Sequence, residues 1–317
     1  MNFKAVDKVA KAVLYEGYML YPYRVSSVKN RQRFNFGVLY TRAYSEQQEG
    51  YDPWFSQTEC LVVGGGSSTL EIHVGFLQLI EQPIRGCTVG APEAIEREVF
   101  LPITCLDALV RRQFVWNATF AGGENTEPGS SNKEIVIQSL VVVAAQCLSE
   151  GLFKITLQVK NAAEPTSSPN TRDEALMHAL ISAYAVLGVQ EGEFVSLLDP
   201  TESLRATVTD CKNIGVFPVL AGDRSRRDMM LSSPIILYDY PEIATESAGD
   251  LFDATEIDEI LSLRILTLTD AEKDEVRNSG DRARSILERT ENLPEEQLIK
   301  LHGVMRGLHP LGEETGR

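Results

Sequence analysis

Apolar side chains recur at every second position through much of the segment from residue 33 to residue 159. A period of two is the repeat of a β-strand that buries one face. The runs 135–144 and 152–159 are also rich in β-branched residues, which favour strands. We therefore predict an antiparallel sheet for this half of the chain, closed as a barrel or packed as a sandwich. The clearest alternating sets are Phe34, Phe36, Val38 and Tyr40, and then Phe114, Trp116, Ala118 and Phe120.

A glycine run, Gly64-Gly65-Gly66-Ser67-Ser68, separates two of the predicted strands, 58–63 and 70–79. The spacing predicts a hairpin loop. A phosphate-binding loop would need a helix after the glycines and a lysine in the P-loop position, and neither follows. A short helix is predicted at 106–111.

The pattern changes after a Pro/Ser-rich connector at 164–170. Thr171 and Glu174 form a capping box, and apolar residues then recur at helical spacing as far as Leu187. Predicted strands and a short helix follow up to residue 238. This alternation indicates a smaller α/β part.

The last 65 residues carry helix signals. Asp253 with Glu256 and Thr269 with Glu272 are spaced as N-terminal caps, and Pro294 begins a third apolar periodicity. The predicted fold class is thus α+β, or mixed α/β. It has a β-rich N-terminal unit at 1–163, an α/β unit at 171–248 and an acidic helical tail at 249–317.

The net charge of −15 is unevenly distributed. Residues 1–44 contain eight Lys/Arg against two Asp/Glu, whereas residues 241–317 contain nine against 18. A strongly acidic chain repels phosphate backbones, so nucleic acid is not an expected partner. No apolar run approaches the roughly 18 residues that span a bilayer, and no signal-peptide core follows the N-terminus. We expect a cytoplasmic protein without membrane contact.

Standard catalytic signatures are missing from the sequence. The five cysteines include no C-x-x-C pair, the four histidines include no H-x-x-x-H pair, and G-x-S-x-G is absent. No cofactor is indicated. The missing signatures favour a protein that is not an enzyme, but they leave the question open.

Aromatic and basic residues gather near the N-terminus. Such a composition suits a protein interface or contacts with an anion. The alternative is an amphipathic edge, with tyrosine rings packed on a sheet and their hydroxyls in water. The candidate binding residues are Tyr15, Tyr21, Tyr23, Arg24, Lys29 and Asn30.

Carboxylates are densest between residues 239 and 259. Close carboxylates bind hard cations or share a proton, but the spacing is not that of an EF-hand. A solvated acidic loop is the competing interpretation. The candidate metal ligands are Asp239, Asp250, Asp253 and Glu256.

Three stretches carry a family resemblance: VLYEGYMLYPYR at 13–24, SSPIILYDYP at 232–241, and GDLFD followed by TEIDEIL at 249–261. They resemble an uncharacterised bacterial family associated with gene clusters of nickel–iron hydrogenases of the high-affinity, actinobacterial type. The resemblance implies an accessory role in making or supporting such a hydrogenase. It carries over no catalytic residue.

The sequence therefore predicts a non-enzymatic accessory or interaction protein. Its partner would be another protein, and the resemblance points to a hydrogenase subunit or maturation factor. A homo-oligomer is compatible with the same pattern. The alternative is a metal-dependent or acid–base enzyme that acts on a small ligand with the carboxylates of 239–259.

Overall fold

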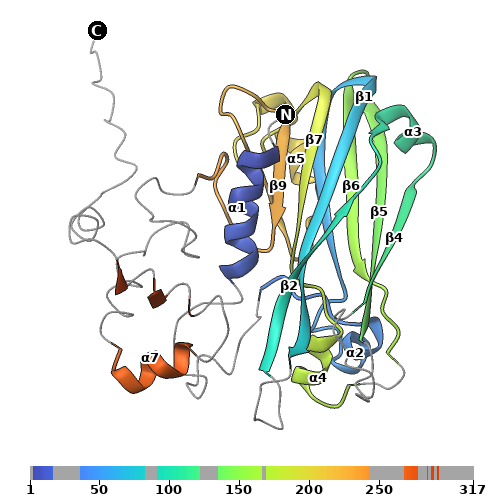
Figure 1. Cartoon of the computed structure of the whole chain (residues 1–317). Coiled ribbons are helices and arrows are strands. Elements are labelled where there is room, and N and C mark those ends of the chain that lie inside the picture. The colour runs from blue at the N-terminus through green and yellow to red at the C-terminus, as the bar shows by residue number, and fades with distance from the viewer. Residues whose placement is uncertain are drawn as a thin grey trace.

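Nine strands form one antiparallel sheet in the computed structural model (Figure 1). The structure describes residues 3–16, 36–82, 91–121, 135–165, 169–242, 268–277, 284, 287–288 and 291–292. Seven strands follow the order β4-β5-β6-β1-β7-β9-β8, and β2 and β3 pair with β1 beside this path. In these ranges no helix is long and apolar enough to cross a membrane.

The elements have the following bounds. The strands are β1 (Phe55–Gln82), β2 (Ala91–Phe100), β3 (Thr104–Cys105), β4 (Phe114–Ala121), β5 (Val136–Ser149), β6 (Leu152–Asn161), β7 (Ile181–Phe194), β8 (Phe217–Leu220) and β9 (Met229–Ser233). The helices are α1 (Phe3–Glu16), α2 (Arg42–Gln47), α3 (Leu106–Arg111), α4 (Arg172–Met177), the 3-10 turn η2 (Glu202–Leu204), α5 (Arg205–Thr209) and α7 (Asp270–Arg277).

The glycine run does not form the predicted hairpin loop, because β1 continues through it. The pairing of β1 with β7 shifts register between Gly64 and Thr69, where the Ser68 hydroxyl donates to the Glu191 carbonyl at 2.6 Å. A Cβ on Gly64 would lie 2.6 Å from the Ser68 hydroxyl oxygen. The glycine here permits close approach inside a strand rather than a reversal of the chain.

The predicted α/β part is wrong, because β7, β8 and β9 belong to the same antiparallel sheet as β1. The Thr171 cap is confirmed, since its hydroxyl accepts from the Glu174 amide at 3.2 Å. Helix α4 nevertheless ends at Met177, and β7 begins at Ile181. Residues 181–189 are buried on both faces of the sheet. A continuously apolar run of this kind also satisfies a helical period, which explains the misassignment.

The predicted helical C-terminal tail is also wrong as a description of what the structure shows. In the described residues after 249, α7 is the one element with stated bounds and has eight residues, and residues 284, 287, 288 and 291 are helical as isolated pieces. Asp253 and Glu256, the predicted cap of an earlier helix, lie outside the described residues. The observed fold is mostly antiparallel β, and its sheet is open rather than closed as a barrel.

Two hydrophobic clusters cover the two faces of the central strands. The first contains Val6, Val9 and Ala10 of α1, packed with residues of β7 and β9. The second lies between the central strands and the inner faces of β4, β5 and β6, with α3 at one end. Figure 1 shows α1 on one side of the sheet and β4 to β6 on the other. The sheet thus coils far enough for part of it to pack against itself.

Candidate functional site

The predicted tyrosine and arginine site lies almost entirely outside the described residues. Tyr15 falls within α1, and the residues Tyr21, Tyr23, Arg24, Lys29 and Asn30 are not described. Their role as a partner or anion site stays a prediction.

Asp239 is the single predicted metal ligand within the described residues, and hydrogen bonds occupy its carboxylate. The Ser196 hydroxyl donates to Oδ2 at 2.5 Å, and the Leu220 amide donates to Oδ1 at 2.8 Å. Asp250, Asp253 and Glu256 lie outside the described residues. In the described part of the chain, no three His, Cys, Asp or Glu side chains gather as a metal site would require.

An apolar pocket is lined by residues of β1, β4 and β5, by Leu109 of α3 and by the segment 101–104. About 370 Å³ of space without protein atoms lies here, which includes open solvent, and the centre of a water-sized sphere can occupy about 30 Å³ of it. Its floor includes Leu70, Ile72 and Val143, which are buried. The full lining is Leu70, Ile72, Leu101, Pro102, Thr104, Leu109, Phe114, Val115, Trp116 and Val143.

The pocket exists because the core-facing side of β4 is only partly covered. Phe114, Ala118 and Phe120 alternate along β4 and pack against the second cluster. Trp116 belongs to the same alternating set, yet 42% of its surface is exposed. A tryptophan on the buried side of a strand normally reaches a packed neighbour. The open space beside the Trp116 ring is the pocket.

Exposed apolar side chains and two arginines lie next to the lining residues along the chain. Val115 is 54% exposed and Ile103 is 57% exposed. Arg111 and Arg112 are exposed where α3 ends, and the Arg112 guanidinium lies 4.9 Å from the centre of the Phe114 ring. An open apolar surface with a charged rim is the usual composition of a protein-binding patch.

The lining offers almost no polar group to a ligand. Apart from the indole N–H of Trp116, Thr104 carries the one polar side-chain group of the lining, and its hydroxyl donates to the Pro102 carbonyl at 3.0 Å. Sites for small polar metabolites place several polar groups around the ligand to orient it. This pocket is chemically suited to an aliphatic or aromatic group.

Polar contacts around His73 and Lys11 hold α1 against the sheet. The His73 ring stacks on Phe3 at 4.3 Å between ring centres and contacts the Glu71 carboxylate at 3.1 Å. The Lys11 ammonium lies 3.2 Å from the Glu96 carboxylate, and this hydrogen bond raises the pKa of Lys11. Burial raises the pKa of the Asp7 carboxyl. These contacts dock a helix, and their side chains surround no cavity that the structure describes.

A buried carboxylate fixes the segment between α5 and β8. Glu59 Oε2 accepts from the Lys212 amide at 2.9 Å and lies 3.5 Å from the Lys154 ammonium. The Glu59 amide in turn donates to the Asn213 side chain at 2.8 Å. Because the Glu59 carboxylate and the Glu59 amide both bond within the chain, we interpret Glu59 as a structural residue.

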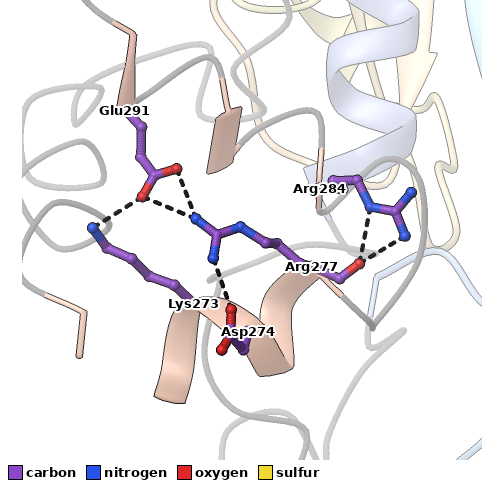
Figure 2. A network of polar contacts seen from close by, with 5 residues as sticks. All are labelled: Lys273, Asp274, Arg277, Arg284 and Glu291. Atoms are coloured by element: carbon purple, nitrogen blue, oxygen red, sulfur yellow. Dashed lines mark hydrogen bonds and ion pairs between the residues drawn. The ribbon is translucent and has the colours of Figure 1, made fainter. Parts of the chain in front are cut away.

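The described tail has its own polar network (Figure 2). The Glu291 carboxylate lies 3.0 Å from the Lys273 ammonium and 3.1 Å from the Arg277 guanidinium, which also reaches Asp274 at 2.8 Å. The Arg284 guanidinium donates to the Arg277 carbonyl. The hydrogen bond from Lys273 is the main reason that the pKa of Glu291 is lowered. The network ties α7 to the residues that follow it, and exposed pairs of this kind stabilise proteins little.

Sequence reasoning missed the pocket as a site. The alternation that placed Trp116 on the core side of a strand was available, and so was the apolar run 100–103 before α3. The missing information was tertiary, because the sequence does not say which inward-facing side chain lacks a neighbour. No protein-family model matches the chain, and a search of curated proteins finds no relative.

Proposed function

We propose that this protein is a non-enzymatic binding protein whose pocket beside β4 receives an apolar side chain of a partner protein. The observation that carries the proposal is the open apolar pocket next to a half-exposed Trp116. Aromatic and aliphatic side chains inserted into such pockets supply most of the affinity at protein interfaces.

A polypeptide partner suits the pocket better than a small metabolite. The Thr104 hydroxyl is already bonded within the chain, and the indole N–H of Trp116 alone offers too few polar contacts to orient a small polar ligand. A side chain carried on a polypeptide is oriented by contacts outside the pocket. Arg112, whose guanidinium lies 4.9 Å from the centre of the Phe114 ring, favours an acidic residue beside the inserted side chain.

The identity of the partner rests on the sequence resemblance alone. That resemblance makes a hydrogenase subunit or maturation factor the first partner to test. Neither the pocket nor its rim distinguishes that partner from another protein with an apolar, acid-flanked segment.

Site-specific photo-crosslinking in the native host tests the proposal. A crosslinking amino acid at Val115, on the rim, should capture a discrete partner. The same group at Tyr51, which is 86% exposed near α2, should not. Figure 1 shows α2 and α3 at opposite ends of the sheet.

A variant that fills the pocket completes the test. Thr104→Phe should reduce the Val115 crosslink by about tenfold, the loss expected when a ~1.4 kcal/mol contact is excluded. Thr104→Val removes the hydroxyl without filling the space and should retain the crosslink. Equal crosslinking from Val115 and Tyr51, or an undiminished yield in Thr104→Phe, would overturn the proposal.

A further inference from the structure

The outer edge of β4 differs from the other sheet edges that the structure describes. Within the described residues β4 pairs with β5 alone, over eight residues and without a register shift. Its sequence, FVWNATFA, contains no charge and no proline. Long, regular and uncharged edges pair readily with another strand.

The other edges carry the usual protection. Strand β8 has four residues and includes Pro218, and the Tyr240 amide donates to its Leu220 carbonyl. Strand β2 is longer but carries Pro92 and four charged residues, Glu93, Glu96, Arg97 and Glu98. Charges, prolines and short length discourage edge-to-edge pairing. Among the described edges, β4 lacks such protection over residues 114–120, and at its last residue the Arg97 guanidinium of β2 donates to the Ala121 carbonyl at 2.8 Å.

We infer that β4 pairs with β4 of a second copy of this chain, antiparallel, across a two-fold axis at Asn117. This inference goes beyond the proposed function, since it concerns an oligomer that forms with no other partner present. Charge favours this contact over others between copies. The chain carries −15, so most faces repel a copy, whereas β4 is uncharged and follows Arg111 and Arg112.

The register follows from the two faces of the sheet. A two-fold axis normal to the sheet keeps each face on its own side, and directly opposed residues point to the same face. Inner residues of one copy therefore oppose inner residues of the other. With Asn117 opposite Asn117 of the second copy, Trp116 opposes a small residue, Ala118. Shifting the axis to Ala118 would instead oppose Trp116 with Phe120, which crowds two large rings at two places.

The pairing also extends the candidate site. Trp116 and Phe114 line the pocket, and the second copy would place its Ala118 and Phe120 beside them on the same face. A seam of about eight residues a side is smaller than a standard interface of roughly 800 Å² per partner. The dimer is therefore expected to dissociate on dilution rather than to be obligate.

Charge substitution at the axis tests the inference directly. Asn117 is exposed, so Asn117→Lys and Asn117→Asp should each fold as the unmodified chain does. Each variant alone opposes two like charges across the seam, and the dissociation constant should rise by about tenfold or more. Mixing the two variants opposes Lys with Asp and should restore a dimer that contains one of each.

Analytical ultracentrifugation of the full chain provides the readout, with circular dichroism to confirm folding. The unmodified chain should approach twice its 35.1 kDa mass as its concentration rises. Ile236→Lys, at a 73% exposed position away from β4, is the matched control and should dimerise unchanged. A monomer up to roughly 100 μM, a dimer that survives Asn117→Lys, or no rescue on mixing would each overturn the inference.

Discussion

The strands at the two ends of the sheet, β8 and β4, differ in how their outer edges are covered. At the β8 end, the strand is short, contains Pro218, and is closed by residues 239 and 240 of the same chain. At the β4 end, eight uncharged residues lie beside an apolar pocket and a half-exposed Trp116. One end is completed within the chain, whereas the other has the composition of an interface.

The closed end depends on one carboxylate. Asp239 accepts from the Ser196 hydroxyl and from the Leu220 amide, and Ser196 Oγ accepts in turn from the amides of Leu198 and Asp199. The group predicted as a metal ligand therefore acts as a clamp between β8 and the segment after β7. At the open end the described residues provide a smaller counterpart, in which the Arg97 guanidinium donates to the Ala121 carbonyl at the last residue of β4.

The largest expected effect compares the sealed and open parts of the second cluster. Leu187 is fully buried in the centre, whereas Leu109 is buried but lines the pocket. Leu187→Ala should cost about 4 kcal/mol of unfolding free energy, and Leu109→Ala about 2, because a cavity that joins an open pocket can be hydrated. Urea denaturation measures both. Equal losses would mean that the pocket is closed in solution.

The second prediction concerns removal of the Asp239 carboxylate, which links β8 to the segment after β7. Asp239→Ala should lower the free energy of unfolding by about 2–3 kcal/mol, since two hydrogen bonds to a carboxylate are lost. Asp239→Asn keeps the shape and one acceptor, so it should cost less. In a double-mutant cycle with Ser196→Ala, the two losses should not add. Simple additivity would show that the short contact between these side chains contributes nothing.

Local signals in the sequence predicted several elements, although the strand predicted from the alternating set Phe34 to Tyr40 is wrong, since its described residues form only an isolated bridge at Leu39. The helix at 106–111 is confirmed as α3, and the strands near 114–120, 135–144 and 152–159 are confirmed as β4, β5 and β6. Their alternation leaves one face polar or half-buried, so the period of two is visible. The Thr171 cap is confirmed for the same reason, because a cap involves residues only three apart.

Non-local structure could not be predicted in the same way. Residues 181–189 are buried on both faces, which erases the period that separates a strand from a helix. The glycines at 64–66 signal either a turn or a close approach, and only the pairing of β1 with β7 decides between these. The pocket depends on the distance between β4 and the residues 101–104, which no sequence period encodes.

The third prediction tests whether the Trp116 ring, at the β4 end of the sheet, contributes to ligand binding rather than to the core. Trp116→Thr should change the free energy of unfolding by less than about 1 kcal/mol, because the ring is half-exposed and packs on one side only. It should still reduce the binding of a hydrophobic dye such as anilinonaphthalene sulfonate, which would use the pocket and the arginine rim. Phe76→Leu, in the sealed core, is the control and should lower stability without lowering dye binding. A large loss of stability in Trp116→Thr would place that ring in the core instead.

The smallest expected effect is a pH dependence at the closed end. Burial, with a contribution from the Asp239 charge, raises the pKa of Tyr240, whose hydroxyl donates to the Arg226 carbonyl at 3.1 Å. The folded state thus disfavours the ionised phenol. Stability should be unaffected by this group below the unfolded pKa of about 10 and should fall as the pH rises above that value.

Other buried tyrosines act in the same direction, since burial raises the pKa of Tyr40 to about 12 and also raises that of Tyr44. The informative quantity is therefore the difference between the unmodified chain and Tyr240→Phe. Tyr240→Phe should lose a little stability at neutral pH with its hydrogen bond, and this deficit should shrink as the pH rises above about 10. Tyr51→Phe, at an 86% exposed position, is the control for loss of a tyrosine hydroxyl. A deficit that stays constant with pH would mean that Tyr240 ionises as easily in the folded chain as in the unfolded one, and that the residues closing β8 leave this edge open to water.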